Sequence, residues 1–454
     1  MNNLSKAISS PSKESSFGFL EKLFVWSIIL ELLLFFVVAG QDATGVGGNI
    51  SRLLQLTFII LFFIRSLLLP LHSITFFNPL HKYFKWYLIY FIFLIFSMVF
   101  GYSTGAYELY NSRLNTNSFI NSSLVRPIFE YFITLYYFIY FAVLPVFILR
   151  SKKGIDYFFK VFFFLFFLSF VLGVVDLALV VFFQYEFIPR HLSDFRHVGT
   201  RFHGLAGEPR DAFVYLIMGG ALLFVREAWT GIKFNRGLLV LIFFAALATQ
   251  STSGFLGFFL ALAMIFLYQV PGMRRGSILF LLVASITSLT LIFLIIFNSP
   301  RILLYIDSAP MAFEALQNGV NLPPVIMAQI NNIYPLWLRW IELLDGNFFT
   351  SILGTGLGTA SVANGYILTE GGVLNPHSNI IRIFFESGLI GIFLYISAFI
   401  QPLREISKKY EDAKILIIPM FLVLGATLGH RSAAIFISLG IVLLVMIYKM
   451  NHSR

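Results

Sequence analysis

Residues 161–183 read VFFFLFFLSFVLGVVDLALVVFF, and this stretch decides the fold. Asp176 is its only ionisable side chain, and a helix needs about 20 apolar residues to cross a bilayer. The whole chain has the same character: of its 454 residues, 58% are hydrophobic and 12% are charged, against about 25% charged in a soluble domain. A soluble fold of this size would lack the polar side chains to cover its surface. The sequence therefore predicts an all-α polytopic membrane protein.

Apolar runs of nearly spanning length recur on both sides of that stretch. They lie at residues 22–40, 51–70, 83–101, 128–149, 157–184, 211–226, 236–250, 253–270, 277–297, 378–400, 413–429 and 431–449. We therefore expect about twelve transmembrane helices in one integrated membrane domain. Residues 1–297 would form an N-terminal bundle of about nine helices, and residues 378–454 would form the C-terminal helices. Between them, residues 298–377 would form a long extracytoplasmic loop with short helices, one of them amphipathic at residues 335–344.

The basic residues predict which side of the membrane each connection faces. With both termini inside, most of the 32 lysines and arginines fall on cytoplasmic segments, as the positive-inside rule requires. All lysines fall on that side, so every basic residue expected outside is an arginine. Arginine carries a permanent planar charge that binds phosphate or carboxylate in bidentate fashion. An equally open explanation is that arginine tolerates partial burial beside acidic residues better than lysine does.

The densest outer cluster is residues 190–210, RHLSDFRHVGTRFHGLAGEPR. Such basic density outside opposes the positive-inside tendency, and an anionic ligand is its simplest explanation. We expect four of its side chains to converge where the next helix begins, because the positive end of the helix dipole also favours an anion there. The four are Arg201, His203, Glu208 and Arg210. The alternative is a solvated loop with internal salt bridges.

A second cluster is residues 375–391, NPHSNIIRIFFESGLIG. His377 would lie at the outer end of a helix, with Arg382 and Glu386 one and two turns into the membrane. Their i, i+4 spacing places these two on one helix face, where they could pair. Ionisable residues inside a span indicate function, although a structural ion pair is an equally good explanation.

Smaller polar groups occupy other expected outer turns. Residues 250–254, QSTSG, offer hydroxyls to a sugar or phosphate, or cap the next helix. Arg431 follows His430 in a tight turn, and Arg339 precedes an aromatic residue in the long loop. The Gly-x-Gly-x-Gly of residues 354–358 marks a turn but follows no strand, so it is no dinucleotide fingerprint. Glu31, inside the first apolar run, is a candidate polar contact or coupling site.

The order of these motifs is similar to that of a known superfamily. GEPRDA at 207–212, TQSTSGFLG at 249–257, LRW at 338–340, LGTGLGT at 353–359 and HSNIIRIFFESGLIG at 377–391 follow one another. The chain in this region, roughly residues 200–400, resembles the O-antigen polymerase and ligase superfamily of bacterial inner membranes. The closer likeness is to Wzy-type polymerases of O-antigen, capsule or exopolysaccharide.

The resemblance implies a GT-C-like, metal-independent membrane glycosyltransferase without a cofactor. It would polymerise undecaprenyl-diphosphate-linked oligosaccharide units at the periplasmic face of the inner membrane. Its partners would be that lipid-linked glycan, the bilayer and a chain-length regulator, with no nucleic acid. The family's outer-loop arginine matches Arg210, the histidine that opens its late helix matches His377, and the Arg-Trp pair of its long loop matches Arg339. Ser378, between His377 and Asn379, departs from the commoner His-Asn pattern.

This chemistry assigns roles to the candidates. Breaking a sugar–diphosphate bond requires stabilisation of the leaving diphosphate, which arginines supply without a metal. We assign Arg210 and Arg201 to that task, with Arg339 as a third clamp. Glu208 and His377 are the alternatives for the group that accepts or orients the attacking hydroxyl. The remaining substrate-binding candidates are His203, Arg382 and Arg431.

Two other functions are compatible with the sequence. A ligase that transfers finished glycan to lipid A core would share the donor half of the site. A flippase or transporter of lipid-linked glycan would also have about twelve spans, but it should show broken helices and charges near the bilayer midplane. The crowding of polar residues on one face favours an enzyme.

Overall fold

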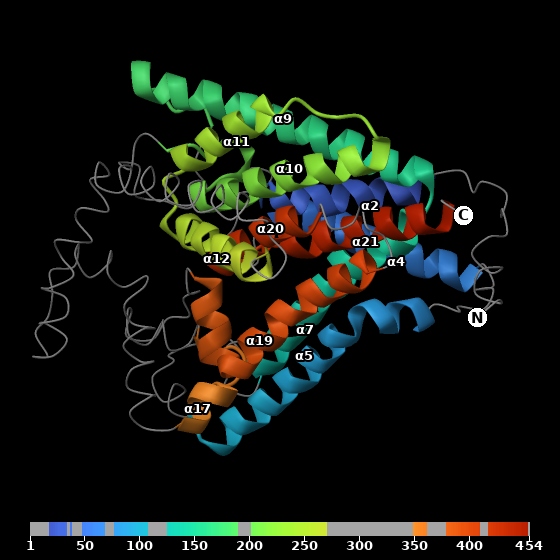
Figure 1. Cartoon of the computed structure of the whole chain (residues 1–454), viewed down its shortest axis with the longest axis vertical. Coiled ribbons are helices and arrows are strands. Elements are labelled where there is room, and N and C mark those ends of the chain that lie inside the picture. The colour runs from blue at the N-terminus through green and yellow to red at the C-terminus, as the bar shows by residue number, and fades with distance from the viewer. Residues whose placement is uncertain are drawn as a thin grey trace, which may run out of the picture.

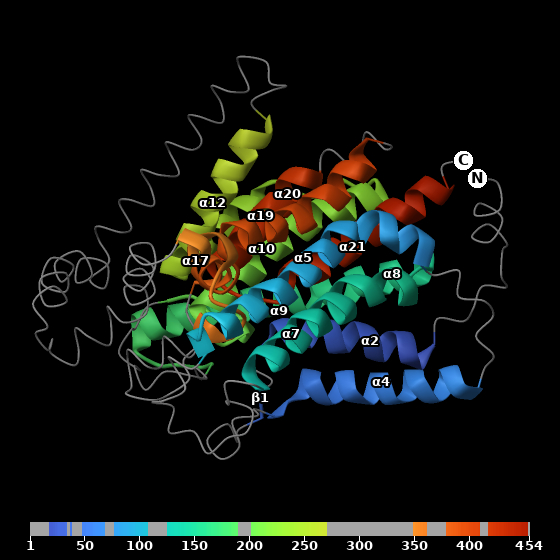
Figure 2. The ribbon, with the colours of Figure 1, turned by 90° about the horizontal axis from the view of Figure 1, so that it is seen from below.

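The computed structural model describes residues 18–33, 37–38, 48–68, 77–107, 125–188, 201–269, 348–360, 378–408 and 416–452. Nearly all of these residues are helical. Within these ranges, the strands are β1 (Val37–Val38) and β2 (Gly48–Asn49), which pair antiparallel. The long helices run roughly along a common direction and pack into one bundle (Figure 1, Figure 2).

The helices follow the expected apolar runs closely. Their bounds are α2 (Phe19–Ile29), η1 (Leu30–Leu32), α4 (Ile50–Leu68), α5 (Phe77–Ser103), α7 (Val125–Tyr137), η4 (Phe138–Val143), α8 (Leu144–Ile148), α9 (Lys152–Phe183), η5 (Gly204–Ala206), α10 (Pro209–Thr230), α11 (Gly237–Ala248), α12 (Thr252–Gln269), α17 (Phe348–Leu353), α19 (Asn379–Ser407), α20 (Ile417–Gly429) and α21 (Ala434–His452). Among the described residues, six helical segments are long and apolar enough to cross a membrane, and four shorter apolar helices accompany them. The prediction of a polytopic helical membrane protein is confirmed.

The first apolar run differs from its expectation. We expected one span over residues 22–40, but the helix ends at Leu32, and Val37–Val38 forms a strand. Valine is β-branched and favours a strand where a pairing partner is present, here Gly48–Asn49. Glu31 therefore lies at the end of its helix and not in mid-span. The expected helices at residues 277–297 and 335–344 lie outside the described residues.

The two ends of the bundle have different chemistry. Contacts between helix ends define one of them, which we call the arginine end: Arg382 near the start of α19 bonds Glu130 near the start of α7, and Asp211 at the start of α10 contacts the turn before α21. The lysines of the described residues, on helices, directly after α19 or in the loop between α10 and α11, all lie toward the opposite end, which we call the lysine end. They are Lys22, Lys82, Lys85, Lys152, Lys153, Lys160, Lys233, Lys408 and Lys449.

Small residues bring α12 and α20 into close contact beneath the arginine end. A Cβ atom on Gly425 would collide with the carbonyl oxygen of Gly257, and one on Gly257 would collide with that of Gly425. A Cβ on Gly429 would likewise collide with the carbonyl oxygen of Ser253. Such small-residue contacts let helix backbones approach closely in membranes. This packing fixes the place of the turn that follows Gly429.

Helix α19 is broken at Gly388, whose φ of 64° and ψ of −167° are not helical. Figure 1 shows the two halves meeting at a sharp bend. The break leaves backbone carbonyl groups without their usual partners inside the helix. The carbonyl of Phe385 accepts a hydrogen bond from the Thr355 amide (2.9 Å), and that of Glu386 accepts from the Ser97 hydroxyl (2.6 Å).

Residues 354–359, which we call the glycine loop, fill this break. Gly354, Gly356 and Gly358 all have positive φ, the region that glycine adopts without strain. The amide of Gly356 donates to the Glu386 carbonyl (2.9 Å). A Cβ on Gly356 would collide with the hydroxyl of Tyr107, which donates to the loop at Leu357 (3.0 Å). Burial, assisted by Glu386, raises the pKa of Tyr107 well above its usual range, so its hydroxyl keeps the proton it donates.

Candidate functional site

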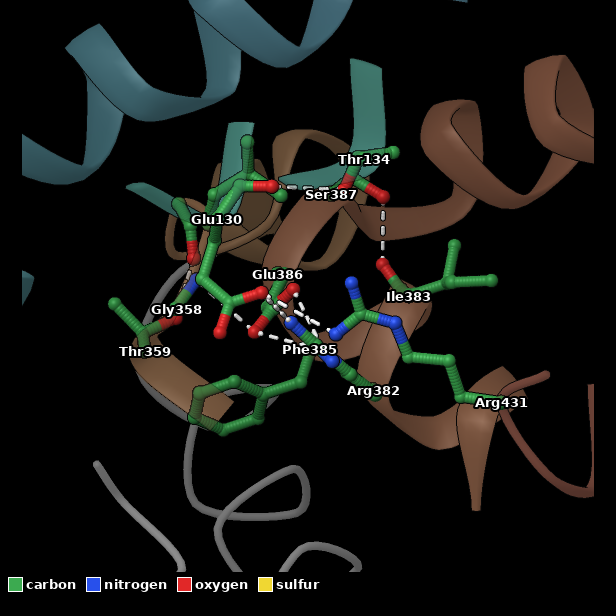
Figure 3. A network of polar contacts seen from close by, with 12 residues as sticks. Glu130, Thr134, Gly358, Thr359, Arg382, Ile383, Phe385, Glu386, Ser387 and Arg431 are labelled. Atoms are coloured by element: carbon green, nitrogen blue, oxygen red, sulfur yellow. Dashed lines mark hydrogen bonds and ion pairs between the residues drawn. The ribbon is translucent and has the colours of Figure 1, made fainter. Parts of the chain in front are cut away.

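Glu130, in the second turn of α7, is the centre of a buried group of charges. Its Oε2 accepts hydrogen bonds from Nη2 of Arg382 (2.7 Å) and Nη1 of Arg431 (3.2 Å). Its Oε1 accepts from Nη2 of Arg126 (2.5 Å). Figure 3 shows the side chains of Arg382 and Arg431 both directed at the Glu130 carboxylate. Two helices, α7 and α19, and the turn before α21 are thus joined at one carboxylate.

Glu386 completes this group. Nε of Arg382 lies 3.2 Å from its Oε2, so the i, i+4 pair that the sequence suggested is present. The amide of Gly358 donates to Glu386 Oε1 (3.0 Å), which ties the glycine loop to the same carboxylate. We call the five residues the charge cluster: Arg126, Glu130, Arg382, Glu386 and Arg431. Three guanidinium groups face two carboxylates there, and the excess positive charge favours an incoming anion.

A second polar group adjoins the charge cluster across Tyr137. Nη2 of Arg52 bonds Glu31 Oε1 (2.6 Å) and the Tyr137 hydroxyl (2.8 Å). The guanidinium carbons of Arg52 and Arg431 lie 5.6 Å and 5.8 Å from the centroid of the Tyr137 ring. Glu31 also accepts from the Ser51 hydroxyl (2.7 Å), so it is a polar contact, as one of our two alternatives for it proposed.

A third polar group lies where α10 begins. Nε of Arg210 forms an ion pair with Oε2 of Glu208 (2.5 Å) and lies 4.0 Å from Oδ2 of Asp211. The other oxygen of Asp211 lies 2.9 Å from Nε2 of His430. Because His430 directly precedes Arg431, this contact links the start of α10 to the charge cluster. The turn that carries His430 and Arg431 therefore lies at the arginine end.

Helix polarity adds to the positive potential of the arginine end. The N-termini of α4, α7, α10, α19 and α21 all lie here, and each has an arginine in or just before its first turn. These arginines are Arg52, Arg126, Arg210, Arg382 and Arg431. Each of these arginines therefore adds positive charge where the helix dipole is already positive. Together the helix ends and guanidinium groups form a field that attracts and binds anions.

Two sequence candidates make their described contacts elsewhere. Arg201 donates from Nε to the Thr249 carbonyl (2.8 Å) and from Nη2 to the Gln250 carbonyl (3.1 Å), at the end of α11. His203 is buried against α9, with Nε2 3.1 Å from Oδ2 of Asp176. These contacts secure the chain before α10 and do not join Arg201 and His203 to Glu208 or Arg210. The convergence of all four side chains that we expected is therefore not formed by these contacts.

Other candidates have simpler outcomes. His377 and Arg339 lie outside the described residues. The hydroxyl of Ser251 accepts from the Gly254 amide (3.2 Å), so in residues 250–254 this hydroxyl has the helix-capping role that was one alternative. The side-chain amide of Asn379 donates to the Thr427 carbonyl (2.9 Å), which holds α19 to α20.

Sequence reasoning missed Glu130, Arg126, Arg52 and Tyr137 as parts of the site. One signal was available for the first two, because Arg126 and Glu130 stand i, i+4 at the start of an apolar run. No feature of the neighbouring sequence marks Arg52 or Tyr137 as a site residue. Their contact depends on α4 and α7 lying side by side, which the periodicity of a single helix does not reveal.

The chain was compared with protein-family models and with curated proteins. No protein-family model matches the chain. No curated protein matches it significantly either.

Proposed function

We propose that the protein is a membrane glycosyltransferase of the bacterial inner membrane. It would polymerise undecaprenyl-diphosphate-linked oligosaccharide repeat units, as Wzy-type polymerases of O-antigen, capsule or exopolysaccharide do. The observation that carries the proposal is the set of arginines at five helix N-termini on one end of an apolar bundle. An end of that composition suits a dianionic lipid-linked donor, which reaches the site laterally from the bilayer.

The proposal includes a topology of twelve spans with both termini in the cytoplasm. The lysine end would then face the cytoplasm, in agreement with the positive-inside rule, and the arginine end would face the periplasm. Lipid-diphosphate-linked glycans used for polymerisation face the periplasm in the family that the motifs resemble. The arginine end and the donor would thus lie on the same side of the membrane.

The proposed chemistry divides the charged residues by role. As the sugar–phosphate bond breaks, negative charge develops on the leaving diphosphate, and Arg431 and Arg210 stabilise it with partly exposed guanidinium groups. Arg382, buried between Glu130 and Glu386, holds the carboxylate that orients Arg431. An acceptor hydroxyl attacks the sugar, with Glu208 or His377 as the group that orients it or accepts its proton.

A flippase remains the second candidate, because the structure contains one feature that such a protein would share. Transporters use discontinuous helices at their substrate sites, and α19 is discontinuous beside Arg382 and Glu386. These two residues lie in the first two turns of α19, near one end of the bundle. Substrate sites of transporters lie near the bilayer midplane, so the position of the charges favours the enzyme.

Reconstitution tests the proposal directly. The protein in liposomes is supplied with a lipid-diphosphate-linked repeat unit from the host, and products are separated on a gel. We expect a ladder of multiples from the unaltered protein. Arg431→Gln should lower the rate of transfer by about 100-fold, the effect of removing one donor to a developing anion. Arg210→Ala should lower it similarly.

A matched control is available at the lysine end. Arg236 pairs with Glu227 (2.9 Å) and lies over aromatic rings, as Arg431 does, so Arg236→Gln removes the same kind of contact far from the proposed site. Arg236→Gln should leave the ladder unchanged. Transfer that requires added lipid A core would assign the protein as a ligase. Movement of substrate to the opposite leaflet without any transfer would refute the enzyme and support the flippase.

A further inference from the structure

We propose that Arg52, together with Tyr137 and Arg431, forms an additional oxyanion-binding subsite for an acidic group of the substrate. The inference rests on the proposed function and deepens it. It implies that the substrate carries an acidic group that binds this subsite, either on the glycan or on the lipid carrier. The subsite lies at the start of α4, a helix to which the sequence assigned no substrate-binding residue.

The position of Arg52 requires an explanation. It is the third residue of α4, where the helix dipole disfavours a cation. Glu31 balances its charge, but the two side chains are buried unequally: Glu31 is 6% exposed and Arg52 is 46% exposed. The carboxylate is thus covered, whereas the guanidinium is presented outward.

The hydrogen bonds of Arg52 leave donors for a ligand. Both described contacts, to Glu31 and to the Tyr137 hydroxyl, use the Nη2 atom. A guanidinium has five N–H groups on three nitrogens. Because both contacts use Nη2, Nε and Nη1 make no protein hydrogen bond within the described ranges. These are the donors with which arginine binds a carboxylate or phosphate.

Arg431 supplies the second charge of the subsite. It bonds the buried Glu130 through Nη1, yet its side chain is 36% exposed. Its guanidinium and that of Arg52 each lie less than 6 Å from the centroid of the same Tyr137 ring. Two positive charges thus lie beside one tyrosine ring, and together they raise the positive potential there, which favours an oxyanion.

The local backbone supports a functional explanation for Tyr137. It directly precedes η4 (Phe138–Val143), a π-helical turn between α7 and α8. Such turns are rare and occur frequently at functional sites. The preceding residue, Tyr136, donates its hydroxyl to Oε1 of Gln55 on α4 (2.6 Å). Adjacent tyrosines thus fix both the ring and the helix that carries Arg52.

A structural brace between α2 and α4 is the competing explanation for Arg52. The two explanations make opposite predictions for Glu31→Gln. Removing the carboxylate would break a brace, but it would leave the guanidinium of Arg52 with one fewer competitor for an anion. Arg52→Gln, in contrast, removes both the brace and the subsite.

The test measures binding to the full-length protein in nanodiscs of neutral phosphatidylcholine by microscale thermophoresis. The probes are trigalacturonate as an acidic glycan, maltotriose as a neutral one, and inorganic pyrophosphate as the diphosphate of a carrier. We expect Arg52→Gln to weaken trigalacturonate binding about tenfold, the loss of one charged hydrogen-bonding partner. Maltotriose binding should not change. Arg236→Gln is the matched control and should bind all three probes as the unaltered protein does.

Each outcome decides a part of the inference. Weaker trigalacturonate binding assigns the subsite to an acidic sugar, whereas a loss confined to pyrophosphate assigns it to the carrier's diphosphate. If Arg52→Gln binds trigalacturonate and pyrophosphate as tightly as the unaltered protein does, the subsite is overturned. Equal loss in Glu31→Gln and Arg52→Gln also overturns it, in favour of the brace. If binding depends on Arg52 but the reconstituted protein makes no ladder, the subsite stands and the proposed glycosyltransferase function is refuted.

Discussion

Glu130→Gln is expected to lower the free energy of unfolding by about 3–5 kcal/mol, because it leaves buried arginines without their shared carboxylate. Glu130 is 3% exposed and bonds three guanidinium groups, of which that of Arg382 is nearly as buried. Glutamine has almost the same shape, so the loss measures charge and not packing. Unfolding by denaturing detergent, followed by far-ultraviolet circular dichroism, gives the free energy.

Glu227→Gln is the matched control for that measurement. Glu227 pairs with the half-exposed Arg236 at the lysine end. A solvent-exposed ion pair contributes at most about 1 kcal/mol, so this variant should unfold almost as the unaltered protein does. If the two variants lost equal stability, the charge cluster would not be the low-dielectric site that its burial indicates.

Gly388→Ala is expected to prevent the break in α19 from forming as it does now. The φ and ψ of Gly388 lie in a region that is essentially restricted to glycine, which costs an alanine about 1–3 kcal/mol. In addition, a Cβ would collide with the carbonyl oxygen of Ile352. The glycine loop would have to move, and Gly358 would lose its hydrogen bond to Glu386. We expect a clear fall in thermal unfolding temperature and loss of polymer formation.

Two other glycines separate the causes of that effect. Gly105 also has positive φ, but nothing lies within 4 Å of its Cβ position, so Gly105→Ala tests backbone strain alone. Gly220 lies within α10 with only ordinary contacts around its Cβ position, so Gly220→Ala should be neutral or slightly stabilising. If Gly388→Ala were as stable as Gly105→Ala, the collision with Ile352 would cost nothing, and the expectation would be wrong.

The sequence predicts the helices well because lipid imposes a simple rule. Any segment in the hydrocarbon core must satisfy its own backbone, so apolar length alone locates a span. The exception is residues 22–40, where apolar length continued past the end of the helix. The short strand at Val37–Val38 depends on a pairing partner ten or more positions away, which hydropathy does not detect.

The site is predictable only in part, for a related reason. Arg382 and Glu386 stand i, i+4 on one helix, so their pairing follows from the sequence. Glu130 is the centre of the site, yet its partners come from α19 and from the turn before α21, far along the chain. The glycine loop was identified as a turn, but its docking against Phe385 and Glu386 requires the break in α19. No local pattern encodes contacts of this kind.

The confinement of lysine to one end has a practical consequence for handling the protein. Primary amines, which N-hydroxysuccinimide esters modify, lie on the described helices only toward one end of the bundle. Guanidinium groups do not react with these reagents under mild conditions. Amine coupling to a sensor chip should therefore attach the molecule in one orientation, with the arginine end directed into solution. Lipid-linked or soluble glycans can then be presented to that end while the attachment chemistry leaves its charged side chains intact.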